Sequence, residues 1–216
     1  MTESISISTA TSSKGKAIAG IIICLIAWLA IIVQLILMTG TITNFFSFFT
    51  IQCNLLIAVS LTCINFFPKS SAAKFFSRPS VVTGIGLYIF IVGFVYNIVL
   101  RKLVSLSGLS LLVDNTLHVF IPILYLMYWM LFTKKDHLPL NSGLRWLWFP
   151  FFYLVYTLIR GSFVDWYPYP FLNAAKLGYE KVIVNILVML AVFLIAGIVL
   201  IAISRMLAKK QDKSIL

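Results

Sequence analysis

Six long apolar runs constrain this chain more than any other feature of its sequence. A helix of 20 residues rises about 30 Å, the thickness of the hydrocarbon core of a bilayer, so apolar runs of roughly 18 residues or more indicate transmembrane helices. The chain is 61% hydrophobic, whereas soluble domains are roughly 45–50% apolar, and its mean hydropathy is +1.04. We therefore expect an integral membrane protein with spans at residues 17–38, 45–67, 81–104, 112–132, 144–159 and 182–206.

The fold class expected from these runs is all-α, with the six spans packed in one transmembrane bundle over residues 17–206. Residues 1–16 are rich in Ser and Thr and are expected to form a disordered tail, and residues 207–216 a basic C-terminal tail. The first run lacks the small-residue cleavage pattern of a signal peptide, which indicates an uncleaved span. The fifth run is short and contains Pro150, which predicts a first-turn position or a kink.

Lys and Arg indicate the orientation of the bundle, because cytoplasmic loops carry an excess of both. One set of alternating segments holds five of the 17 basic residues, namely Arg101, Lys102, Arg160, Lys176 and Lys181. The other set, which includes both tails, holds the remaining twelve. We therefore expect both termini to face the cytoplasm and the protein to lie in the cell (inner) membrane.

Net charge and cysteine content exclude other classes. The formal charge is +11, but the cations are spread over helix ends and short loops, which indicates topology and contact with anionic lipids rather than nucleic acid as a partner. Cys24, Cys53 and Cys63 form neither a CxxC pair nor a disulfide framework. All three lie inside expected spans and are interpreted as small core residues.

Polar side chains inside the spans are the candidates for function, because such groups are costly in hydrocarbon and are expected to face the bundle interior. Spacings of three or four residues place them on single helix faces. They are Ser47, Thr50 and Asn54 in the second run, Asn97 and Arg101 in the third, Asp114 and His118 in the fourth, and Tyr153, Tyr156 and Arg160 in the fifth.

Thr50 and His118 are expected to meet at one depth. In the predicted topology their helices enter from the same side, and both residues lie five or six positions in, ~8–9 Å below the boundary. A threonine hydroxyl beside an imidazole is typical of a nucleophile and its general base, with an acidic group orienting the ring. Either Asp114, one turn before His118, or Asp165 could take that orienting role.

Other polar residues extend this candidate site. Asn54, Asn115 and Arg101 could donate hydrogen bonds to an oxyanion or to a substrate carboxylate, and Arg101 or Arg160 could hold a free carboxylate. Asn97, Tyr153 and Tyr156 are further candidates for substrate binding.

Several alternatives stay open at this point. Thr50 and Asn54 could simply join neighbouring helices, and Asp114 with His118 could be a structural polar pair. The aromatic residues of "WYPYPF" are typical of an interfacial belt and of loop packing. Zinc needs three or four ligands, and His118 with Asp114 is the only convincing pair, since His137 lies at the other side. We therefore expect no metal site.

Two other function classes fit the same composition. Intramembrane Asp, His and Arg also mark the ion and proton paths of transporters and channels, although the sequence shows no inverted repeat and no paired Gly/Pro-broken helices. A non-catalytic lipid-binding protein would draw on the same residues as an enzyme.

Three stretches, "FFTIQCNLL", "DNTLHVFIPIL" and "WYPYPFLN", resemble a family of small multispanning proteins. This family includes the androgen-induced and androgen-dependent membrane hydrolases and a prokaryotic branch of uncharacterised membrane proteins. The likeness to the prokaryotic branch covers residues 18–205, and the likeness to the animal enzymes is confined to the three stretches. The animal members hydrolyse fatty acid esters of hydroxy fatty acids within the membrane, using one threonine and one histidine.

The resemblance implies that Thr50 is the catalytic threonine, although Asn54 stands where the family has a leucine. It implies that His118, followed by Pro122, is the catalytic histidine. The aromatic-Pro-Phe-Leu loop of the family is matched at residues 169–172. Asp114 stands where animal members often have Asn, a departure that could change the rate or the substrate.

These observations together predict an intramembrane hydrolase. Thr50 would attack the acyl carbonyl of a fatty-acyl ester and His118 would act as general base, without a cofactor. The expected partners are the lipid or fatty acid ester substrate and the membrane lipids. The sequence indicates neither the particular ester nor the oligomeric state.

Overall fold

The computed structural model describes residues 2–213, and the side chains of residues 14–210. This part of the chain is helical without strands, as expected. Six segments are long and apolar enough to cross a membrane, and they match the six expected runs. They are Lys14–Leu37, Phe49–Phe66, Pro79–Leu103, Gly108–Phe132, Asn141–Val164 and Tyr179–Lys210.

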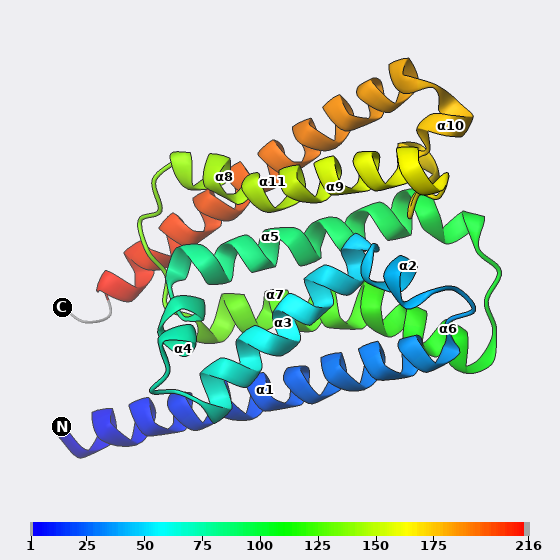
Figure 1. The fold of residues 1–216 in the computed structure, drawn as a ribbon. Helices are drawn as coiled ribbons and strands as arrows, with labels where there is room; N and C mark the ends of the chain where they lie inside the picture. The colour runs from blue at the N-terminus through cyan, green and yellow to red at the C-terminus, as the bar shows by residue number, and fades with distance from the viewer. Residues whose placement is uncertain (1, 214–216) are drawn as a thin grey trace.

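Shorter elements connect or extend the long helices (Figure 1). The α-helices are α1 (Thr2–Leu37), α2 (Ile42–Phe46), α3 (Phe49–Phe66), α4 (Ser71–Phe76), α5 (Pro79–Val95), α6 (Gly108–Asn115), α7 (Ile121–Phe132), α8 (Asn141–Trp146), α9 (Trp148–Val164), α10 (Ala174–Leu177) and α11 (Tyr179–Lys213). Two π-helical turns, η1 (Tyr96–Leu100) and η3 (Thr116–Phe120), and two 3₁₀ turns, η2 (Arg101–Leu103) and η4 (Pro170–Leu172), complete the set.

Helix α5 lies at the centre of the bundle. Helices α1, α3 and α7 lie on one side of it, and α9 and α11 on the other (Figure 1). The chain begins and ends at the same end of the bundle, at the left of Figure 1. The opposite end, where α3 and α11 begin and α9 ends, is called the far end below.

The second span differs from the expectation at its start. The sequence placed it from Phe45, but the helix breaks after α2, and α3 begins only at Phe49. Ser47 Oγ donates to the Thr43 carbonyl oxygen at 2.7 Å, and Phe48 is extended (φ −78°, ψ 127°). A serine that bonds a backbone carbonyl competes with the regular helix. The break makes Thr50 the second residue of α3.

The fifth span is longer than expected. It covers Asn141–Val164 instead of residues 144–159, because α8 precedes α9. Pro150 is the third residue of α9, so the expected first-turn position is confirmed. A proline fits there because the first-turn N–H groups have no partner within the helix.

The two expected tails stay predictions. Helix α1 begins at Thr2, but the side chains of the first 13 residues lie outside the described part. Of the basic C-terminal tail, residues 214–216 also lie outside it. The cysteines are free, and Cys24 and Cys53 are buried as expected, whereas Cys63 is half-buried.

Trp146 of α8 packs into a notch at Gly84 of α5. A methyl group added at Gly84 would lie 2.8 Å from Trp146 Cδ1, whereas one at Gly86 would meet no atom closer than 3.7 Å. The indole is held in place, because its Nε1 donates to the Ser80 carbonyl oxygen at 3.0 Å. Gly84 therefore sets how closely α8 approaches α5.

Gly84→Ala is expected to lower the free energy of unfolding by about 1–3 kcal/mol, the usual cost of overpacking. Gly86→Ala is the matched control in the same helix, and it should be neutral or stabilising by about 0.5–1 kcal/mol because alanine favours helix. Thermal melts of the detergent-purified variants would measure both. Equal melting temperatures for the two variants would contradict this packing.

Candidate active site

Thr50 and His118 meet at the far end of the bundle. The distance from Thr50 Oγ1 to His118 Nε2 is 3.2 Å, a hydrogen-bond distance, and it joins the start of α3 to the turn η3. Thr50 is 7% exposed. The expectation that these two residues lie at one depth is confirmed.

The other ring nitrogen of His118 faces Asp114. Nδ1 lies 2.9 Å from the Asp114 carbonyl oxygen and 3.1 Å from Asp114 Oδ1. Both are acceptors, so Nδ1 carries a proton and the neutral ring leaves the lone pair of Nε2 for the Thr50 hydroxyl. Of the two acids expected to orient the imidazole, Asp114 is the one that lies beside Nδ1. Asp165 instead ends α9, with a left-handed backbone (φ 48°).

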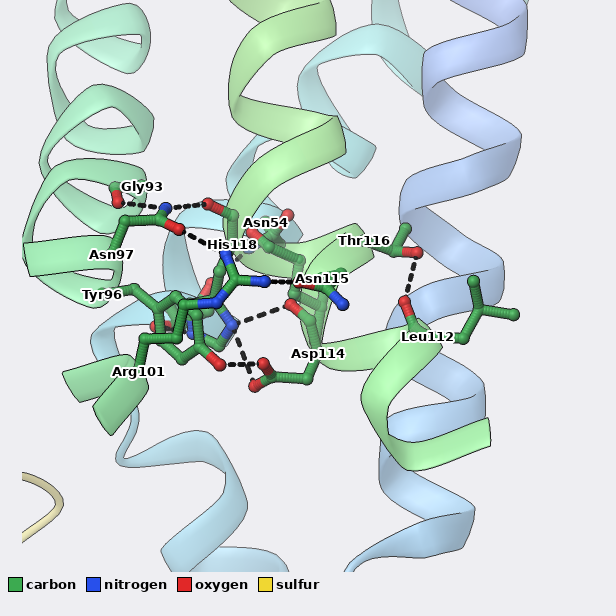
Figure 2. Close-up of polar contacts among 12 residues, drawn as sticks. Asn54, Gly93, Tyr96, Asn97, Arg101, Leu112, Asp114, Asn115, Thr116 and His118 are labelled. Atoms are coloured by element: carbon green, nitrogen blue, oxygen red, sulfur yellow. Dashed lines mark hydrogen bonds and ion pairs between the residues drawn. The ribbon is translucent and has the colours of Figure 1, made fainter. Parts of the chain in front are cut away.

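Tyr96 contacts both His118 and Asp114, a role that the sequence did not indicate. Its ring stacks on the His118 imidazole, with centroids 3.9 Å apart and an interplanar angle of 15°. Its hydroxyl donates to Asp114 Oδ2 (Figure 2). The carboxylate thus binds both the imidazole and the ring stacked on it, which fixes the orientation of His118.

Arg101, Asn97 and Asn115 form a polar group beside the imidazole (Figure 2). Arg101 Nη1 donates to Asn97 Oδ1 at 2.7 Å, and Arg101 Nη2 donates to Asn115 Oδ1 at 2.9 Å. Asn97 Nδ2 in turn donates to the Gly93 carbonyl oxygen at 2.7 Å. Three of the expected substrate-binding or supporting residues therefore come together, with the guanidinium exposed at the far end.

Asn54 is fully buried, and its amide is already engaged. Nδ2 donates to the carbonyl oxygens of Thr50 at 2.8 Å and Leu117 at 3.3 Å. Both N–H groups are thus used on the backbone, so Asn54 positions α3 relative to η3. Asn54 Oδ1 finds no hydrogen-bond partner among the described residues.

The polar residues expected on the fifth span bind the segment that precedes Thr50. Tyr153 donates to the Ser47 carbonyl oxygen at 3.1 Å, and the Tyr156 hydroxyl lies 2.8 Å from Ser47 Oγ. Arg160 donates to Asn44 Oδ1 at 2.5 Å. These contacts fasten α9 to the helix break before α3, and none of them involves the imidazole.

Tyr169, in the loop between α9 and α11, is the second residue that sequence reasoning missed as a member of the site. Its hydroxyl accepts a hydrogen bond from the Thr50 backbone N–H at 3.2 Å and lies 3.3 Å from Thr50 Oγ1. Burial raises the pKa of Tyr169 to about 12. In the sequence Tyr169 is one aromatic residue of the "WYPYPF" loop and the first residue of the matched aromatic-Pro-Phe-Leu segment, but nothing local indicates that this loop folds back onto Thr50.

An apolar cavity of about 470 Å³ reaches Thr50 from between α5, α9 and α11. Thr50, Tyr153 and Tyr169 are the lining residues that carry a hydroxyl, and the rest are aliphatic or aromatic, including Val92, Leu147, Trp148, Leu154, Met189 and Phe193. Trp148, the first residue of α9, also lines the cavity and precedes Tyr153 by five positions, so the cavity extends roughly 7–8 Å away from the far end.

Together, fold and site define a helical protein with six helices long and apolar enough to cross a membrane, in which a buried threonine meets a half-buried histidine and aspartate beside an apolar cavity. Comparisons of the chain with protein-family models, curated proteins and solved structures find no match. Among the described residues, no three His, Cys, Asp or Glu side chains come together as metal ligands would.

We expect His118 to be the Nδ1-protonated tautomer at alkaline pH, because both partners of Nδ1 only accept hydrogen bonds. Nitrogen-15 NMR of histidine-labelled protein, with His137→Gln to leave one signal, would measure this. Asp114→Leu removes the carboxylate acceptor and should weaken the preference. A wild-type ring protonated on Nε2 instead would contradict this hydrogen-bond assignment.

Proposed function

We propose that this chain is an intramembrane hydrolase that cleaves a fatty-acyl ester, with Thr50 as nucleophile and His118 as general base. The proposal includes the cell membrane as its location and the cytoplasm as the side of both termini, which follows from the distribution of Lys and Arg. The observation that carries it is the position of Thr50, whose hydroxyl lies at hydrogen-bond distance from the imidazole and which is one of the residues that line the apolar cavity.

The first chemical step uses the geometry of the imidazole. Thr50 Oγ1 attacks the acyl carbon while His118 Nε2, 3.2 Å away, takes the hydroxyl proton. The resulting imidazolium is stabilised by Asp114, which already binds Nδ1. His118 then returns the proton to the leaving alcohol, and water attacks the acyl-threonine with His118 again as base.

The cavity would hold the acyl chain. Thr50 is one of its lining residues, together with residues of α5, α9 and α11, so an acyl chain bound in it could bring its carbonyl carbon to the Thr50 hydroxyl. Each buried methylene contributes about 0.8 kcal/mol. Binding should therefore increase with chain length until the cavity is full.

Other features support the proposal. The resemblance to the androgen-induced and androgen-dependent membrane hydrolases assigns the same two residues to catalysis. Arg101 lies beside Asn97 and Asn115, and Arg160 binds Asn44; either guanidinium could bind a carboxylate of the substrate. No step requires a cofactor.

The test is hydrolysis of a panel of long-chain fatty acyl esters by detergent-purified protein. Thr50→Ala and His118→Ala should each lower kcat by at least about 10³-fold, because nucleophile and base act as a unit. Thr133→Ala and His137→Gln are matched controls that change the same residue types away from the cavity, and both should retain activity.

Melting temperatures would show that the inactive variants are folded. Turnover that persists in Thr50→Ala or His118→Ala would refute the assignment of roles. Absence of turnover on every ester, with binding of fatty acids retained, would instead favour a non-catalytic lipid-binding protein that uses the same cavity.

Leu147→Trp is expected to shift the substrate preference toward shorter acyl chains, because the indole would fill the end of the cavity remote from Thr50. The value of kcat/KM should fall roughly fourfold for each methylene excluded. Phe152→Trp is the control, since Phe152 is 63% exposed and lies outside the cavity wall. An unchanged chain-length profile for Leu147→Trp would contradict this placement of the acyl chain.

A further inference from the structure

We propose that Tyr169 is a third catalytic residue, whose hydroxyl donates a hydrogen bond to the oxyanion that forms when Thr50 attacks the ester. This inference rests on the proposed hydrolase function. It assigns a role in the reaction to the loop between α9 and α11, which sequence reasoning interpreted as aromatic packing.

The hydrogen bonds at Tyr169 direct its proton toward the reacting oxygen, because the hydrogen of Thr50 Oγ1 lies toward His118 and leaves Tyr169 as the donor to Oγ1. The hydroxyl oxygen accepts from the Thr50 backbone N–H at 3.2 Å, so that contact uses a lone pair and not the phenolic hydrogen. The same oxygen lies 3.3 Å from Thr50 Oγ1. When Oγ1 bonds to an acyl carbon, the oxygen of that carbonyl is one bond farther on, within reach of the phenol.

The phenol is held rigidly. The Tyr169 ring is parallel to that of Phe171, with centroids 5.3 Å apart and an interplanar angle of 6°. It meets the ring of Phe48 edge-on, with centroids 5.8 Å apart. A donor that is fixed before the reaction needs no reorganisation during it, which is the property that makes oxyanion sites effective.

The N-terminus of α3 also stabilises negative charge on the oxyanion. Thr50 is the second residue of the helix, and no side chain of the N-cap residue Phe48 caps it. The N-terminus of a helix carries a partial positive charge. Negative charge that develops next to Thr50 is therefore stabilised by both the phenol and the helix end, inside a cavity with apolar walls.

The proposed step is balanced without another reactant. The Thr50 proton moves to His118 Nε2, the Oγ1–carbon bond forms, and the carbonyl π electrons move to its oxygen, which accepts the Tyr169 hydrogen bond. The carbon–alkoxy bond then breaks, and the leaving oxygen takes the proton from His118. Tyr169 keeps its own proton throughout, consistent with a pKa of about 12.

Tyr169→Phe tests the inference, because it removes only the hydroxyl and keeps the ring that packs on Phe171. We expect kcat to fall by about 10²–10³-fold, the usual cost of losing one oxyanion donor, with KM changed by less than about threefold. Tyr125→Phe is the matched control, since it removes a buried hydroxyl that donates to the Val82 carbonyl, away from the cavity.

Binding of an ether analogue separates catalysis from packing. An ether lacks the carbonyl, so Tyr169→Phe should bind a long-chain ether as tightly as the wild type does and melt at a similar temperature. Weaker ether binding together with a lower melting temperature would show a structural role and overturn the inference.

A kcat within threefold of wild type in Tyr169→Phe would also overturn it. If Thr50→Ala is inactive at the same time, only the assignment of Tyr169 fails and the hydrolase function stands. A wild-type protein that turns over no ester would overturn both.

Discussion

The hydrogen bond between Thr50 and His118, with Tyr96 stacked on the imidazole, joins three interruptions of regular helix. The break at Ser47 and Phe48 brings Thr50 to the start of α3. On the facing helix, His118 lies in the π-helical turn η3, and Tyr96 lies in a second π-helical turn, η1, on α5. Such turns are rare and occur frequently at functional sites. Irregular backbone thus positions both Thr50, which bonds the His118 imidazole, and Tyr96, which stacks on it.

Close approach of α5 and α7 keeps these turns in contact. A side chain at Gly93 would lie 3.2 Å from the His118 carbonyl oxygen, so only glycine lets the two backbones come this near without adjustment. Asn97 uses the resulting space to donate to the carbonyl oxygens of Gly93 and His118. In an apolar bundle, freed backbone carbonyls need partners within the protein. The polar residues around the site therefore have a structural task as well as a chemical one.

The six spans and the pairing of Thr50 with His118 could be predicted from the sequence, because both depend on residue counts and hydropathy. Hydrophobic run length gave six segments, and counting residues from the span ends gave the common depth of Thr50 and His118. The same reasoning could not choose between Asp114 and Asp165, which needs the position of the loop. It also missed Tyr96 and Tyr169. A π-helical turn changes which side chains share a face, and the return of the loop onto Thr50 depends on contacts between residues 119 positions apart.

The exposed apolar residues in the wall of the cavity bear on how a ligand would enter it. Several residues that line it are also among the more exposed apolar residues of the molecule, including Leu144 at 61%, Trp148 at 60% and Phe151 at 50%. The cavity is therefore bordered by the surface that would face lipid. A substrate dissolved in the bilayer would reach Thr50 sideways, by diffusion in two dimensions. Its effective concentration would then be set by its mole fraction among the membrane lipids and not by its solubility in water.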